Sequence, residues 1–176
     1  MQSRRVLSLE PIGEDPEVGR WLSAMEDARR DTLRELKGVP DEALEWAPDA
    51  RTNTIGTLLY HIALIEDDWL FADTLEAEDH PIRPRNLFPF PDRVEGRRLT
   101  PVTGFTMEEH LERLAIVRRL LLELLRPMTA QDFHRVRERP DFDVSPAWVL
   151  HHLLQHEAEH RAHIAWARDA RIDSRA

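Results

Sequence analysis

The sequence predicts an all-α protein, and three observations carry this prediction. Four long segments repeat apolar residues at helical spacing, whereas few segments alternate apolar and polar residues as strands do. Residues typical of helix starts and helix ends bound these four segments. One long proline-rich connection joins the second segment to the third. We therefore predict a four-helix bundle that forms a single domain over residues 1–176.

The first helix is expected over residues 15–36, where apolar side chains recur about one turn apart. Gly38 and Pro40 follow it, and both residue types are typical of helix ends. A brief helical turn is then expected within residues 39–46.

The second helix is expected over residues 53–75, because Asn53 and Thr54 are favourable N-cap residues. The connection over residues 77–105 contains five prolines, which forbid a continuous helix or a central strand. A loop of this length in a small domain is usually functional or loosely ordered.

The third helix is expected over residues 106–125, and it is the most apolar of the four. Thr106 and Glu109 have the spacing of a capping box at its start. The fourth helix is expected over residues 145–170, with Ser145 as N-cap and a proline at the first helical position.

Composition and charge exclude several classes of function. The chain has 24 Lys and Arg against 33 Asp and Glu, a net charge of −9 that would repel nucleic acid. No stretch approaches the roughly 20 apolar residues of a membrane span. There is no cysteine, so disulfides and thiolate metal sites are excluded. The N-terminus does not resemble a secretory signal, and we expect a cytoplasmic protein.

Histidines are the unusual feature of this composition, with nine in the chain and several near its end. His156 and His160 lie roughly 40° apart on a helical wheel, on the face that should be apolar. Two buried imidazoles without partners would cost free energy, and a shared metal ion would remove that cost. His61 on the second helix is the best candidate for a third ligand. Three neutral histidines would leave a divalent ion, expected to be zinc or nickel, with an open position, as in catalytic sites.

Two other interpretations of these histidines remain open at this point. His152 lies one turn before His156, so the metal-binding pair could be His152 and His156 instead. The histidines could also be core residues without a metal.

The segment His156–His160 also matches the H-E-x-x-H motif of zinc peptidases, in which Glu157 would be the general base. The context of the motif is poor. Only sixteen residues follow it, none of which suits a third ligand, and no edge strand is expected that could bind an extended peptide. We keep a zinc peptidase as the weakest alternative.

Several motifs resemble the DinB-like (DinB/YfiT) superfamily of metalloenzymes. Residues 53–63 and 66–70 resemble the second helix of that family, and His156-x-x-x-His160-Arg161 resembles its last helix. The connector over residues 44–48 is also similar. The resemblance covers most of the chain, and the order and separation of the motifs make it fairly specific.

This resemblance implies a four-helix bundle, often a homodimer, with a divalent metal ion on His61, His156 and His160. Some relatives resemble transferases that use low-molecular-weight thiols such as mycothiol or bacillithiol. The chain departs from the family pattern at Ala162, where a glycine is common, and at His163, where glutamine is frequent. These departures put close packing or an outer-shell role in doubt, but not the ligands.

Our leading hypothesis is a metal-dependent enzyme, either a thiol S-transferase or a hydrolase-like enzyme, that acts on a small molecule. Asp68 could face the mouth of the site or lie on a solvated acidic face. Glu157 is expected to orient other groups or lie at the surface, and only secondarily to act as a base.

The loop over residues 77–105 could either cap the metal or simply pack over the bundle. In the first case Asn86, Leu87, Phe88 and Phe90 would lie near the substrate. The alternative class of function is a non-catalytic bundle whose metal or apolar face supports dimerisation.

Overall fold

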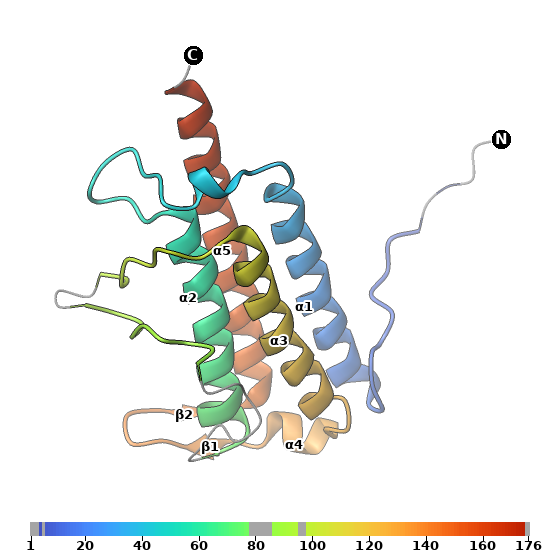
Figure 1. Cartoon of the computed structure of the whole chain (residues 1–176). Coiled ribbons are helices and arrows are strands. Elements are labelled where there is room, and N and C mark those ends of the chain that lie inside the picture. Colours follow the sequence, from blue (N-terminus) through green and yellow to red (C-terminus); the bar gives the residue numbers. More distant parts are fainter. Residues whose placement is uncertain (1–3, 5, 78–85, 95–97, 175–176) are drawn as a thin grey trace.

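The structure, a computed structural model, describes residues 4, 6–77, 86–94 and 98–174 and is mainly helical, as predicted. Its long helices lie side by side (Figure 1). They are α1 (Pro16–Glu35), α2 (Ile55–Asp68), α3 (Met107–Leu125) and α5 (Pro146–Asp173). Among the described residues, no helix combines the length and apolar character needed to cross a membrane.

Side-chain caps explain where the long helices begin. The capping residues are Asp15, Thr54, Thr106 and Ser145, each of which accepts a hydrogen bond from a backbone N–H of the first turn. The side chain of Glu109 also accepts a hydrogen bond from the backbone N–H of Thr106, at 2.7 Å, which completes the predicted capping box. These caps satisfy N–H groups that have no partner within the helix, so local sequence fixes the boundaries.

Short elements complete the chain. The predicted turn is the 3₁₀ helix η1 (Asp41–Ala43), and α2 continues into a π-helical segment, η2 (Trp69–Thr74). The elements between α3 and α5 were not predicted. They are α4 (Ala130–His134) and an antiparallel pair of two-residue strands, β1 (Arg137–Glu138) and β2 (Asp143–Val144). Elements this short contain too few residues to show a helical or strand periodicity.

The helices α2 and α3 are neighbours that run in the same direction, so the chain must return along the molecule between them (Figure 1). This explains why the connection between them is long. In the described parts of this connection, Phe88 and Phe90 pack against Tyr60 of α2. The predicted irregular structure of residues 78–85 and 95–97 lies outside the described residues.

A layer of buried charge crosses the interior of the molecule. Each long helix contributes one member, and none of the four side chains is more than slightly exposed. We call this set the polar layer; its members are Arg29 (α1), Glu66 (α2), Arg118 (α3) and Glu157 (α5). Two positive and two negative charges balance, which is what makes burial of the set tolerable.

Hydrogen bonds within the polar layer are short and numerous. Arg29 donates to Glu157 at 2.7 Å and to Glu66 at 2.7 Å. Arg118 donates to Glu66 at 2.7 and 3.0 Å and to Glu157 at 2.9 Å. A shift of any helix by one turn would leave charges buried without partners, so the layer favours one register of the helices.

Apolar residues pack on both sides of the polar layer. One buried cluster lies toward α4 and includes Leu22, Leu121 and Phe133. The other lies toward η1 and includes Leu58 and Ile164. Along α1, α3 and α5, the charged residue falls between buried residues of the two clusters, and Glu66 falls between those of α2 and those of η2. The polar layer therefore divides the core.

Candidate metal centre

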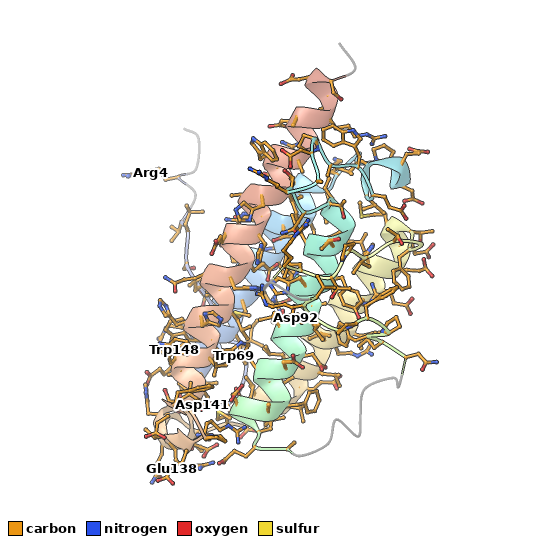
Figure 2. All side chains as sticks on the ribbon, turned by 90° about the vertical axis from the view of Figure 1, so that its left-hand side faces the viewer. Arg4, Trp69, Asp92, Glu138, Asp141 and Trp148 are labelled. Carbon is orange, nitrogen blue, oxygen red and sulfur yellow. The ribbon has the colours of Figure 1, made fainter. Side chains whose placement is uncertain are left out.

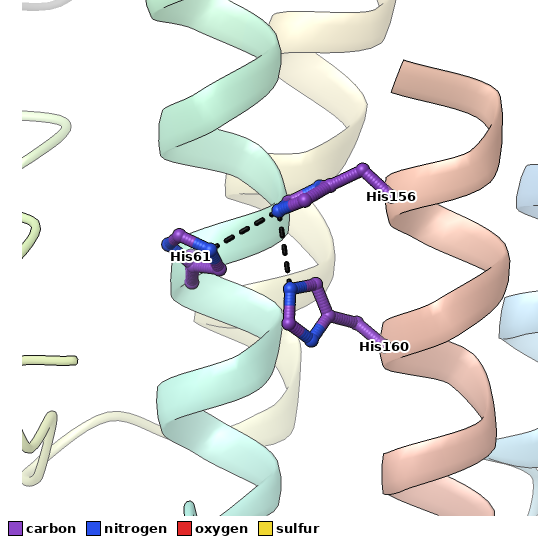
Figure 3. Close-up of side chains that lie close together, drawn as sticks. All are labelled: His61, His156 and His160. Carbon is purple, nitrogen blue, oxygen red and sulfur yellow. Dashed lines mark hydrogen bonds between the residues drawn. The ribbon is translucent and has the colours of Figure 1, made fainter. Parts of the chain in front are cut away.

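The helices α2 and α5 pack against each other and bring three histidines together (Figure 3). His61 comes from α2, and His156 and His160 come from adjacent turns of α5. One ring nitrogen of each histidine belongs to a group whose members all lie within 4.8 Å of one another. His61 is buried, and the other two are partly exposed. The structure thus brings together the three histidines that the resemblance implied as ligands.

The distances suit a shared metal ion. The Nε2 atom of His156 lies 3.1 Å from Nε2 of His61 and 3.1 Å from Nε2 of His160. Nitrogen ligands about 2.0–2.1 Å from one ion lie roughly 2.8–3.0 Å apart at adjacent octahedral positions and roughly 3.3–3.4 Å apart in tetrahedral geometry. Imidazole is a good ligand for zinc, nickel, copper and iron. The donor set and its spacing therefore fit a divalent transition metal.

All three imidazoles are poised in the neutral form that binds metals. Burial, followed by the neighbouring histidines, lowers the pKa of His156 to about 3 and that of His160 to about 4. Burial also lowers the pKa of His61, although Asp92 opposes this shift. A group with a lowered pKa is deprotonated at neutral pH, so each ring has a lone pair available for a metal.

Outer hydrogen bonds orient two of the three rings. The Nδ1 atom of His61 lies 2.6 Å from Oδ1 of Asp92, and the neutral ring donates a hydrogen bond to this carboxylate oxygen. Nδ1 of His160 lies 3.4 Å from Nδ1 of His163. Because Nδ1 of His61 is engaged by the carboxylate, its Nε2 presents a lone pair to the other histidines. His163 therefore occupies a position beside a candidate ligand.

Asp92 is the site residue that the sequence did not reveal. It lies 31 residues after His61, in the connection before α3, and no motif marks it. Tyr60 holds this part of the connection against α2, because its hydroxyl donates to Phe90 O at 2.7 Å and accepts from Phe90 N at 2.9 Å. Figure 2 shows Asp92 beside α2. The loop therefore contributes a carboxylate to the site, while its residues Phe88 and Phe90 pack against Tyr60 of α2.

Replacement of Asp92 by asparagine is expected to lower the affinity for zinc or nickel about 10- to 100-fold, as is typical when a ligand histidine loses its carboxylate partner. Asparagine keeps the shape of the side chain but removes the charge that favours the required tautomer of His61. Competition with a chromophoric chelator would measure the affinity. The matched control is Asp141→Asn, which changes an exposed carboxylate between β1 and β2. Equal affinity of Asp92→Asn and the wild type would contradict an orienting role.

The structure leaves the other candidate residues outside the three-histidine group. His152 is outside the group that could hold a metal and stacks on Trp148, with ring centroids 5.1 Å apart. Asp68 is exposed at the end of α2, and the carboxylate hydrogen-bonded to His61 is that of Asp92. Glu157 is buried rather than at the surface, and its carboxylate pairs with the two arginines of the polar layer instead of orienting a histidine.

The fold and the site define a class of protein: a mainly helical protein with a three-histidine group that can hold a metal ion between two helices. Comparison with known proteins agrees with this class. The family model of the DinB superfamily matches residues 24–164, and the chain belongs to that superfamily. It is also 28% identical over 148 residues to the uncharacterized protein YuaE of Bacillus subtilis (strain 168), an alignment that covers 79% of this chain and 91% of YuaE.

Proposed function

We propose that this protein is a metal-dependent enzyme that transfers a low-molecular-weight thiol to a small electrophilic molecule. The observation that carries the proposal is the convergence of three neutral imidazole nitrogens, 3.1 Å apart in two pairs, between α2 and α5. Three protein ligands leave coordination positions for a substrate, whereas a structural site is usually closed by four. We further propose zinc or nickel as the metal and the four-helix bundle of the DinB/YfiT type as the architecture.

A bound divalent ion would supply positive charge that lowers the pKa of a thiol and holds the thiolate as nucleophile near neutral pH. The protein supplies the geometry. His61, His156 and His160 would hold the ion, and Asp92 would fix the orientation of His61. Because His156 and His160 are partly exposed, a small thiol can reach the site from solvent.

A peptidase of the H-E-x-x-H type is disfavoured by the position of Glu157. Burial alone would raise the pKa of this carboxyl, but Arg29 and Arg118 outweigh burial and lower the pKa below its ordinary value. A carboxylate held by two guanidinium groups is a weak base, and it faces the interior rather than the histidines. The H-E-x-x-H match therefore arises because the three-histidine group and the polar layer both take residues from the same stretch of α5.

Turnover of a thiol with 1-chloro-2,4-dinitrobenzene tests the proposal. In this reaction the thiolate sulfur displaces chloride, one C–S bond forms, and a proton is released to the buffer; the absorbance of the thioether reports the rate. Protein loaded with zinc or nickel should accelerate the reaction of a low-molecular-weight thiol. The triple variant His61→Ala, His156→Ala, His160→Ala, treated with the same metal, should not.

Metal content measured by mass spectrometry on protein purified without an affinity tag separates the alternatives. If the wild type contains metal but does not accelerate the reaction of any thiol, a non-catalytic metal-binding bundle is favoured. Sedimentation velocity would then test whether this bundle dimerises. Failure of the wild type to bind metal, even after reconstitution, would contradict the metal-dependent enzyme. A folded and stable triple variant is expected, because a catalytic metal need not hold the fold.

A further inference from the structure

Four aromatic side chains meet beside the three histidines and have no role in the function proposed above. Trp69 opens η2, Phe142 lies between β1 and β2, and Trp148 and His152 belong to α5. The ring centroid of Trp69 lies 5.9 Å from that of Phe142, 5.5 Å from that of Trp148 and 5.0 Å from that of His152. We call these four residues the aromatic patch.

The aromatic patch is open to solvent. Trp148 is 49% exposed and Phe142 is 46% exposed, and the other two residues are partly exposed. Single exposed apolar residues are normal on a protein surface, whereas contiguous exposed apolar residues are more typical of binding sites. The rings of Trp148 and His152 are almost parallel, with an angle of 9° between them, and present a flat surface.

The aromatic patch is continuous with the candidate metal centre. Trp148, His152, His156 and His160 recur every four residues and therefore follow one face of α5. The ring of His152 lies 6.0 Å from that of His156, centroid to centroid. Trp69 and Trp148 lie together toward one end of α5, below Asp92 in the view of Figure 2. From Trp148 to His156 the helix rises about 12 Å, a distance that a small organic molecule can span.

We infer that the aromatic patch binds a flat apolar group of the substrate, while the sulfur atom of that substrate reaches the three histidines. This inference rests on the proposed function, because it assigns the substrate's apolar part to a surface next to the metal. Four side chains offer much less area than the roughly 800 Å² per partner of a stable protein interface. They do match the face of a bicyclic ring, which stacks favourably on tryptophan.

Thiol binding to the cobalt(II)-loaded protein tests the inference, because a thiolate on cobalt(II) gives a charge-transfer absorption band. The probes are 2-(naphthalen-2-yl)ethanethiol and ethanethiol, which share an alkyl thiol and differ in the flat apolar group. We expect the naphthyl probe to bind the wild type more tightly. Trp148→Ala should weaken its binding about tenfold, the size of one aromatic contact, and leave the affinity for ethanethiol unchanged.

Two further variants test whether the effect is specific to the aromatic patch. Trp166 is 54% exposed on the same helix but lies outside the patch, so Trp166→Ala should bind both probes as the wild type does. Phe142→Ala changes an exposed residue outside α5 and should weaken the binding of the naphthyl probe only.

The outcomes distinguish this inference from the proposed function. A band with ethanethiol, combined with naphthyl affinity that is equal in the wild type and Trp148→Ala, would overturn the inference alone. The absence of a band with either probe would contradict thiol binding at the metal and with it both proposals. Conversion of a dimer to a monomer by Trp148→Ala, measured by sedimentation velocity, would show that a second copy covers the patch and would also overturn the inference.

Discussion

His156→Ala is expected to lower the affinity for zinc or nickel by more than about 100-fold, which exceeds the usual effect of removing an outer partner of a ligand. His156 is the central member of the group, because its Nε2 lies 3.1 Å from Nε2 of both other histidines. Without it, two imidazoles on different helices would remain and would hold an ion with fewer bonds. Isothermal titration with chelator-buffered metal would measure the change.

The control for this variant lies on the same helix. His151 is exposed and outside the three-histidine group, so His151→Ala removes a histidine of α5 without removing a ligand. Its metal affinity should equal that of the wild type. Equal losses in His151→Ala and His156→Ala would show that the metal binds to surface histidines in general, and the three-histidine centre would have to be abandoned.

Arg118→Ala is expected to lower the free energy of unfolding by about 3–5 kcal/mol, the cost of removing one partner from a buried ion pair. The guanidinium donates to Glu66, to Glu157 and to the backbone carbonyl of Met25. Its loss leaves two buried carboxylates with a single compensating arginine, Arg29. Urea denaturation followed by circular dichroism would measure the effect.

A neighbouring residue and a second substitution make this test specific. Arg119 is exposed on the next position of α3, so Arg119→Ala should change the stability by less than about 0.5 kcal/mol. The double variant Arg118→Ala, Glu66→Gln removes one charge of each sign and should recover part of the lost stability. No recovery would mean that lost packing rather than unbalanced charge causes the defect.

The same residues predict how stability depends on pH. Arg29 and Arg118 outweigh burial and lower the pKa of Glu157 below its ordinary value of 4.5. The folded state therefore binds the proton less readily than the unfolded state. The resulting stability is fully present above pH 4.5 and is lost as the pH falls through the lower folded-state pKa. In Arg118→Ala this pKa should rise toward 4.5, so the stability that the protein loses on acidification should be smaller than in the wild type.

Local signals explain why the long helices could be predicted so closely from the sequence. The N-caps Thr54, Thr106 and Ser145 stand at the observed starts of α2, α3 and α5. Spacing on one helix was also enough to place His156 and His160 on a common face. His61 could be added because it lies at the edge of the apolar stripe of its own helix.

Long-range contacts explain what the sequence did not show. Asp92 reaches His61 only because the chain folds back along α2, and no spacing rule connects residues in a loop to residues in a helix. The polar layer was hidden for the same reason. Its four members occupy different helices, and an arginine or glutamate in a helix is normally interpreted as exposed. Glu157 in particular was expected at the surface or near the metal.

The polar layer has a further consequence for how the protein opens. Parts of a native protein unfold locally as cooperative units. The two apolar clusters on either side of the layer are candidates for two such units. His156 directly precedes Glu157, so the histidines lie at the boundary. A ligand bound there would be released when either unit opens, and its binding would therefore stabilise both and couple their fluctuations.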